Sequence, residues 1–175
     1  MNNAHDPFEL LDIINEASDV LEQVTKKDAH TKGLLHKTVS ALVVNSNGDH
    51  VLVKQASDRQ DAGQYVVPVG GHLGAGESEE NALKRETKEE IGLSDFDYKL
   101  KGRKIFNRFV IGRQENHFLC LYEISSDDEF SLGDEAVEYQ IFPIAKIKRL
   151  LKETPSIFGD SYRFVLKNFY PDLLL

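Results

Sequence analysis

The stretch GGHLGAGESEENALKRETKEEIGL, Gly70 to Leu93, joins a glycine-rich approach to a strongly helical pattern. Ser78 is a typical N-cap residue, two glutamates follow it in the first turn, and Gly92 stands where a helix would end. The stretch therefore predicts a loop followed by a helix over 78–91. Three acids on this helix are spaced three and four residues apart and share one side of it: Glu86, Glu89 and Glu90.

This gathering of acids costs free energy in the folded chain. Glu86 and Glu90 form a like-charge i,i+4 pair that costs roughly 0.2–0.5 kcal/mol. An acid in the last turn also opposes the helix dipole by roughly 0.3–1 kcal/mol. One interpretation is a solvated acidic helix face. The other is a bound divalent cation, because oxygen ligands of this type suit Mg²⁺ or Mn²⁺ and substrates that bring phosphate oxygens.

The wider spacing favours the cation site. Gly71 is followed after five residues by Glu77, and after seven more by Arg85-Glu86, then by Glu89-Glu90 and Gly92-Leu93. This pattern is similar to the Nudix box, G-x5-E-x7-R-E-U-x-E-E-x-G-U, where U is apolar. Every position matches except one apolar slot, which Thr87 fills. So many fixed residues at fixed spacing make a specific signal, and the chain resembles the Nudix superfamily.

That resemblance implies an α+β fold, a Nudix-type α/β/α sandwich with a mixed central sheet and a loop-helix-loop motif. It also implies Mg²⁺- or Mn²⁺-dependent hydrolysis of the pyrophosphate linkage of a nucleoside diphosphate derivative or another organic diphosphate. The metal ligands carried over by position are Glu86, Glu89 and Glu90 with the Gly71 carbonyl, while Glu77 would support the metal cluster and Arg85 would hold a neighbouring glutamate in place.

Further residues are expected to complete the site. In similar hydrolases a glutamate on a late loop or strand approaches the metals, and Glu135 in GDEAVEY is the preferred base or extra ligand, with Glu138 as the alternative. Either could instead be a surface acid. Arg59 and Lys54 are expected to contact substrate phosphate, although a solvated charge is the competing interpretation for Arg59.

The flanking sequence, roughly 10–139, resembles the isopentenyl-diphosphate isomerase branch of the superfamily. The resemblance rests on His30, on His36 at the start of a strand, on an NSNG turn and on GGH ahead of the box. The isomerases use a cysteine just before the Gly-His pair, where this chain has Gly70. Cys120, in an apolar strand, is predicted to be a small buried side chain. These departures favour a hydrolase; an isomerase-like enzyme and a non-catalytic nucleotide-sensing module are the alternatives.

The isomerases also hold a metal with three histidines and two glutamates. The matching positions imply a second cation site with His117 in place of one glutamate: His30, His36, His72, Glu115 and His117. Imidazole ligands favour a softer ion such as Zn²⁺ or Mn²⁺ over Mg²⁺. The competing interpretation is that these histidines are structural hydrogen-bonding residues at a strand entrance and along a cleft.

Hydrophobic periodicity predicts the remaining elements. A helix competes with strands for the acidic, leucine-rich start of the chain. The predicted strands are 8–14, 19–24, 36–44, 50–56, 64–69, 104–111, 116–124 and 135–142, with 104–111 and 116–124 joined through GRQE; the predicted later helices are 144–153 and 160–170.

The overall composition fits one domain over 1–175, since 41% of residues are hydrophobic and no linker divides the sequence. A net charge of -8 argues against a broad nucleic-acid-binding surface, and no apolar run reaches the roughly 20 residues of a membrane span. The start MNNAHDPFEL lacks the pattern of a secretory signal, and a single cysteine forms no internal disulfide. We therefore expect a cytoplasmic protein with a small-molecule diphosphate substrate; homo-oligomer formation stays open.

Overall fold

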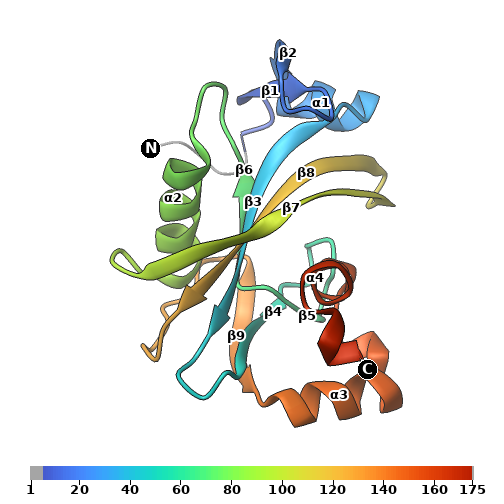
Figure 1. The fold of residues 1–175 in the computed structure, drawn as a ribbon. Helices are drawn as coiled ribbons and strands as arrows, with labels where there is room; N and C mark the ends of the chain where they lie inside the picture. Colours follow the sequence, from blue (N-terminus) through green and yellow to red (C-terminus); the bar gives the residue numbers. More distant parts are fainter. Residues whose placement is uncertain (1–5, 175) are drawn as a thin grey trace.

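The computed structural model describes residues 6–174, which form a mixed sheet with helices on both faces (Figure 1). This is the predicted α+β sandwich. The elements in chain order are β1 (Leu10–Ile14), β2 (Val20–Thr25), α1 (Lys26–Lys32), β3 (His36–Val44), β4 (His50–Gln55), β5 (Tyr65–Val66), β6 (Val69–His72), α2 (Glu79–Ile91), β7 (Asp97–Val110), β8 (Arg113–Ser125), β9 (Ala136–Phe142), α3 (Ile144–Glu153), η1 (Pro155–Ile157), α4 (Asp160–Phe169) and η2 (Pro171–Leu174).

Strand β3 is the centre of the sheet. It pairs antiparallel with β1, β4 and β6 and parallel with β8. Because side chains alternate along a strand, its odd-numbered residues, such as Ala41, pack in the cluster under α2, whereas Leu42 packs with residues of α3 and α4. The sheet is therefore covered by α2 on one face and by α3 and α4 on the other (Figure 1).

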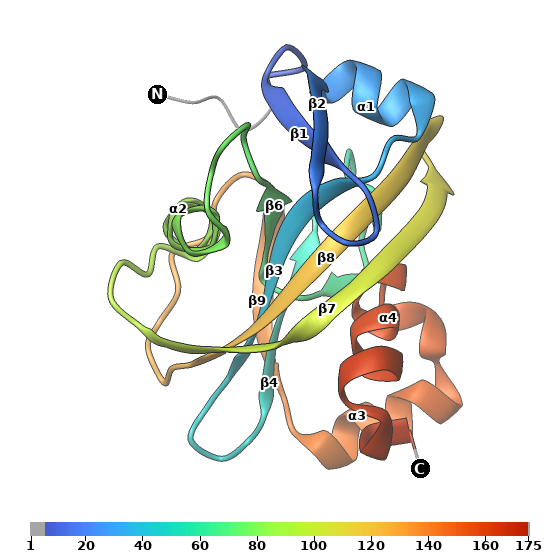
Figure 2. The same ribbon diagram turned by 45° about the horizontal axis from the view of Figure 1, so that its top comes forward.

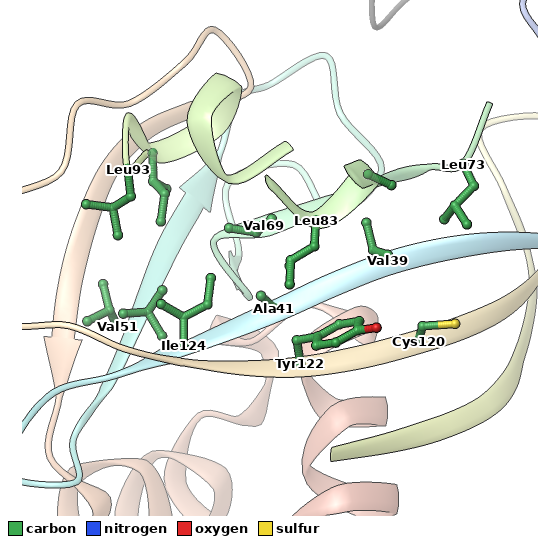
Figure 3. Packing of buried hydrophobic residues seen from close by; sticks show 13 residues of the cluster. Val39, Ala41, Val51, Val69, Leu73, Leu83, Leu93, Cys120, Tyr122 and Ile124 are labelled. Atoms are coloured by element: carbon green, nitrogen blue, oxygen red, sulfur yellow. The ribbon is translucent and has the colours of Figure 1, made fainter. Parts of the chain in front are cut away.

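The core under α2 fixes the position of the acidic helix. Leu83 and Ile91 are fully buried and point from α2 toward β3 and its neighbours, as Figure 3 shows for Leu83 above Ala41. Burying a side chain of this size stabilises the fold by about 1.5–3 kcal/mol. Thr87, the exception in the box, is also fully buried, and its hydroxyl has no hydrogen-bond partner among the described residues. The side chain fits the apolar slot but leaves a polar atom unsatisfied.

Most predicted elements are confirmed, and the first segment forms strands rather than a helix. Helix α1 was not predicted, although the sequence carries its end signals. The Thr25 hydroxyl accepts a hydrogen bond from the Asp28 amide at 3.1 Å, and Gly33 ends the helix with a φ of 64°. Figure 2 shows α1 lying over the end of β8, beside the β1–β2 hairpin.

Three boundaries differ from the prediction. The turn expected at GRQE is wrong, because β7 and β8 are joined by only two residues, Ile111 and Gly112, with φ values of 49° and 72°. Two consecutive left-handed residues match the twist of a hairpin, so the strands continue farther than the sequence suggested. Strand β7 also begins earlier, at Asp97, and the strand predicted over 64–69 is divided near Pro68 into β5 and β6. Within residues 6–174, no helix has the length and apolar character to cross a membrane.

Candidate active site and histidine cluster

Helix α2 begins and ends where its sequence predicts. The Ser78 hydroxyl accepts a hydrogen bond from the Asn81 amide at 3.2 Å, and Gly92 ends the helix with a φ of 76°. The loop before the helix brings Gly70 and Gly71 of β6 against its acidic side. These boundaries place the three box acids, Glu86, Glu89 and Glu90, beside the end of a short strand.

Glu86 lies over Gly71 in a space that only glycine leaves open. A Cβ at Gly71 would lie 2.0 Å from Glu86 Oε1, so any larger residue would displace the carboxylate. Arg85 Nη1 donates to Glu86 Oε1 at 2.5 Å, and its Nε and Nη2 contact Glu77 at 3.1 and 2.9 Å. Arg85 Nη2 also donates to the His72 carbonyl at 3.0 Å. Arg85 thus holds the loop, the strand and two glutamates together.

Glu90 is half-buried and reaches the free edge of β6, where the Gly70 amide donates to its Oε2 at 2.7 Å. Glu89 is exposed, with its carboxylate 3.8 Å from Arg85 Nη1. The three acids therefore differ in exposure but meet at one place.

The electrostatics of this carboxylate cluster are unfavourable without a cation. Burial raises the pKa of Glu86 to about 7, although Arg85 acts in the opposite direction. Burial also raises the pKa of Glu90 well above its usual range, and the charges of Glu86 and Glu135 add to that effect. Clustered carboxylates with raised pKa values suit a divalent cation, which would neutralise their charge. The residues present therefore fit Mg²⁺ or Mn²⁺.

Glu135 is brought to this cluster by the loop that precedes β9. The Ser131 and Gly133 amides donate to the Ile91 and Glu90 carbonyls at 3.1 and 2.9 Å, so the loop covers the C-terminal end of α2. A Cβ at Gly133 would lie 2.7 Å from the Glu89 carbonyl oxygen, which makes the close approach specific to glycine. Glu135 lines the cavity beside the cluster, and Arg59 Nη1 lies 3.3 Å from its Oε1.

Glu138 and Lys54 do not join this site. The Tyr65 hydroxyl donates to Glu138 Oε1 at 2.6 Å, and Lys54 Nζ lies 3.6 Å from the same oxygen. Neither Glu138 nor Lys54 lines the cavity. Lys54 and Glu138 form this ion pair outside the cavity lining, and the substrate contact of Lys54 and the alternative catalytic role of Glu138 stay predictions.

Four histidines form a second cluster. Three come from adjacent strands, because β3 pairs His36 with His117 of β8 and Thr38 with His72 of β6; the fourth, His30, comes from α1. One ring nitrogen from each histidine lies within 4.8 Å of those of the others, and the Nε2 atoms of His30 and His72 are 3.2 Å apart. Alternation along β6 places the His72 side chain on the face opposite Gly71.

The imidazoles are held neutral and partly fixed in orientation. Burial lowers the pKa of His30 to about 4 and of His72 and His117 well below the usual range. The Leu34 carbonyl lies 2.7 Å from His36 Nδ1, while the buried Nε2 atoms of His36 and His117 have no hydrogen-bond partner among the described residues. A hydrogen bond at one ring nitrogen that leaves the other available is typical of metal-binding histidines.

Glu115, predicted as a ligand beside these histidines, is not in the cluster. Arg108 Nε and Arg113 Nη2 donate to its two oxygens at 2.8 and 2.9 Å, and Gln60 Nε2 approaches at 3.3 Å. Burial alone would raise the pKa of Glu115, but the two arginines hold it below its usual value. The predicted ligand set is therefore corrected to four imidazoles, with Glu115 committed to the arginines.

One cavity of about 480 Å³ connects the two clusters. Its wall includes four cations besides Arg59 and Arg85: Lys26, Lys27, Arg108 and Arg113. Lys26 was missed because α1 was not predicted; the helix places Lys26 and His30 four residues apart on one side. Arg108 is held by Glu115, seven residues away in the sequence, and by Asp61 of a distant segment.

Cys120 is fully buried outside the cavity lining, and burial raises the pKa of its thiol to about 12. This agrees with the predicted buried side chain. Gly70 occupies the position before the Gly-His pair, so the cysteine expected of an isomerase is absent from the site.

The sequence model of the NUDIX domain matches residues 34–160, which include the whole box and the loop that carries Glu135. The chain belongs to the Nudix family. Members of this hydrolase family generally cleave pyrophosphate bonds and generally use divalent metal ions. The match includes the glycine-led loop and the acidic helix of residues 70–93.

Relatives of this Nudix chain include an uncharacterized Nudix hydrolase of Nostoc sp., 28% identical over 85% of this chain and 89% of the relative. An isopentenyl-diphosphate Delta-isomerase of Photorhabdus laumondii is 25% identical over 94% of this chain and 95% of its own length. Among solved structures, DR0079 from Deinococcus radiodurans has a TM-score of 0.73 and 20% identity, covering 91% of this chain and 98% of that one. The structural similarity supports the Nudix fold.

Proposed function

We propose that this protein is a metal-dependent pyrophosphohydrolase that cleaves the pyrophosphate linkage of a nucleoside diphosphate derivative or another organic diphosphate. One observation carries the proposal. Buried Glu86, half-buried Glu90 and exposed Glu89 meet over Gly70 and Gly71 at one end of a cavity. Acids kept together at such a cost in electrostatic energy are best explained by cations that they bind.

The roles of the chain's own residues follow from their contacts. Glu86, Glu89 and Glu90, with the Gly71 carbonyl, would hold Mg²⁺ or Mn²⁺, and Glu77 would act through Arg85, which keeps Glu86 in place. A bound divalent ion stabilises the negative charge that develops on the phosphate oxygens and makes a water molecule more acidic. Glu135 would accept the proton of the attacking water as the P–O bond breaks, and Arg59 would orient a phosphate.

An assay across a panel of organic diphosphates, with Mg²⁺ or Mn²⁺ and a coupled phosphatase that releases phosphate from the phosphomonoester products, tests this function directly. We expect metal-dependent release that is abolished in an E89Q/E90Q variant. Metal-dependent binding of a nucleotide without release would instead favour a nucleotide-sensing module. Rearrangement of an isoprenoid diphosphate without release would favour the isomerase, although Gly70 leaves that reaction without its cysteine.

We also propose a second ion, Zn²⁺ or Mn²⁺, at the four histidines. Two observations support this site. One ring nitrogen from each histidine lies within 4.8 Å of the others, and the Nε2 atoms of His36 and His117 have no hydrogen-bond partner among the described residues. Imidazole ligands favour such ions over Mg²⁺. Metal analysis of protein purified without chelator, beside an H36A/H72A variant, tests the site. Stoichiometric metal in both proteins, or histidines without an ion between them in crystals grown with Zn²⁺ or Mn²⁺, would contradict it.

We propose a single Nudix domain over 1–175 that acts in the cytoplasm on a small molecule. Cell fractionation tests the location, and light scattering of the purified protein measures whether it forms a homo-oligomer.

A further inference from the structure

Arg59 is proposed to bind a substrate phosphate and Glu135 to accept a proton from water, yet in this structure the two side chains form an ion pair with each other. Arg59 Nη1 lies 3.3 Å from Glu135 Oε1. Both side chains line the cavity, with exposed fractions of 19% and 34%. While the pair is formed, Arg59 Nη1 and Glu135 Oε1 are not available to a substrate phosphate or to the carboxylate cluster. Full engagement of both side chains at the substrate therefore requires the pair to open.

The backbones of the two residues are fixed side by side, so only the side chains can exchange partners. The Ala56 amide donates to the Glu135 carbonyl at 2.9 Å, and the Arg59 amide donates to the Ala56 carbonyl at 3.2 Å. Gln55 pairs with Ala136 at the end of the β4–β9 ladder, next to a register shift. The loop before β9 is further held by α2 through Gly133. These contacts keep Arg59 within reach of both Glu135 and the cavity.

Asp58 is a weak competitor of Glu135 for the Arg59 guanidinium. The Asp58 carboxylate lies 3.7 Å from Arg59 Nε, but its side chain is 75% exposed and points to solvent-accessible surroundings. A phosphate oxygen in the cavity would compete more strongly, because a guanidinium binds phosphate through two parallel hydrogen bonds with charge on both partners. The ligand that can break the Arg59–Glu135 pair is therefore an anion of the class that this cavity is proposed to hydrolyse.

We propose that the Arg59–Glu135 pair is a latch that substrate opens. It rests on the proposed function: the substrate's phosphate takes Arg59, and the freed Glu135 carboxylate turns toward Glu86, Glu89 and Glu90, where it serves as base or additional metal ligand. In the absence of substrate the latch withholds one carboxylate from the metal cluster. The enzyme thereby completes its site only when a phosphate is present, which limits metal-activated water without substrate.

A double-mutant cycle on Mn²⁺ affinity, measured without substrate by electron paramagnetic resonance of free Mn²⁺, tests the latch. The proteins are wild type, R59M, E135Q and R59M/E135Q. We expect R59M to tighten Mn²⁺ binding about tenfold when Glu135 is present, and by less than about threefold in the E135Q background, a coupling of the size seen between contacting residues. If R59M changed Mn²⁺ affinity by the same factor with and without Glu135, the effect would come only from the loss of a positive charge, and the latch would be overturned.

Matched controls come from another arginine–glutamate pair outside the cavity lining. Arg103 Nη2 donates to Glu79 Oε2 at 2.8 Å, and neither residue lines the cavity. R103M and E79Q should leave Mn²⁺ affinity within about twofold of wild type, because their charges are farther from the cluster and screened by solvent. R59Q replaces R59M if the methionine variant does not fold.

The same measurement separates the latch from the proposed function. If, with Zn²⁺ supplied to fill the histidine site, wild type binds Mn²⁺ no better than E89Q/E90Q, the carboxylate cluster is not a metal site and both proposals fail. If wild type binds Mn²⁺ and the cycle is additive, the latch alone fails.

Discussion

The carboxylate cluster and the histidine cluster share β6 but gather opposite kinds of ligand. On one face and the free edge of the strand, Gly71 and Gly70 contact Glu86 and Glu90; on the other face, His72 joins three more imidazoles. Burial acts on both clusters, favouring protonated carboxylates in one and neutral imidazoles in the other. Hard oxygen ligands and softer nitrogen ligands select different ions. Two adjacent residues of one strand can therefore serve two separate metal sites.

The largest effect is expected in the carboxylate cluster. E89Q and E90Q should each lower turnover by about two orders of magnitude or more, because each removes a charge that stabilises the reaction through bound metal. Thermal unfolding should be unchanged or shifted upward, since each acid opposes the helix dipole or is costly to bury. Steady-state kinetics and calorimetry measure the two quantities. Parallel losses of activity and melting temperature would show that these acids are structural.

His50 is a buried histidine outside both clusters, so it shows the effect of burial on an imidazole that is not a proposed metal ligand. His50 is 3% exposed, its Nδ1 lies 2.7 Å from the Tyr162 hydroxyl, and burial lowers its pKa to about 4. Since the folded pKa lies below the unfolded value, the stabilisation is complete above about pH 6.5 and is lost as the pH falls through about 4. We expect His50 to account for about 3 kcal/mol of the decrease in unfolding free energy between pH 7 and pH 4.

Urea unfolding of wild type and H50Q at pH 7 and pH 4 measures this contribution. The decrease in unfolding free energy should be smaller in H50Q. Identical decreases in the two proteins would assign the whole acid sensitivity to other groups, among them His30.

The histidine cluster should bind zinc without carrying the hydrolysis. H36A removes one of four imidazoles, so we expect Zn²⁺ affinity to fall about tenfold to a hundredfold, while Mn²⁺-dependent turnover stays within about threefold. Competition with a zinc-binding dye gives the affinity, and H50Q serves as the control for loss of a buried histidine. If H36A abolished turnover but not zinc binding, the two clusters would not be independent.

The smallest effect is expected at an acid of α2 that faces away from the cavity. Glu79 accepts hydrogen bonds from Arg103 and from the Tyr122 hydroxyl, at 2.8 and 3.0 Å. E79Q should lower the unfolding free energy by about 1 kcal/mol and leave turnover within about twofold, because it loses a charge-assisted contact and no proposed ligand. Denaturant titration and kinetics check both. A large loss of turnover in E79Q would mean that acids of α2 outside the cavity also contribute to catalysis.

The two clusters also differ in how far the sequence predicts them. The box spans the end of β6, one loop and α2, and its resemblance to the Nudix pattern implied that Glu86 and Gly71 share a site. The histidines come from α1, β3, β6 and β8, and their meeting depends on strand register, which local pattern does not supply. Only the resemblance to the isomerases indicated them, and it included Glu115, whose oxygens pair with Arg108 across the β7–β8 hairpin and with Arg113 on the same strand.

Local signals likewise explain which cations were predicted. The alternation along β4 did not show that Lys54 would pair with Glu138 on the neighbouring strand β9. Lys26 lies on the short helix α1, whose Thr25 cap and Gly33 end are visible in the sequence but enclose few residues. Periodicity predicted the strands and helices, because each core element buries an apolar side that its sequence displays, and the resemblance implied the mixed sheet between two layers.

The parallel pairing of β3 with β8 has a consequence for the order in which the chain matures. These strands are separated by the whole of β4, β5, β6, α2 and β7, so the central ladder requires closure of a long loop of chain. Long-range pairing of this kind slows folding. His36 meets His117 only through that ladder, and Glu135 follows still later in the sequence. A chain emerging from the ribosome can therefore form α2 early, yet it completes neither the histidine cluster nor the part of the cavity wall that carries Glu135 until most of the polypeptide has been made.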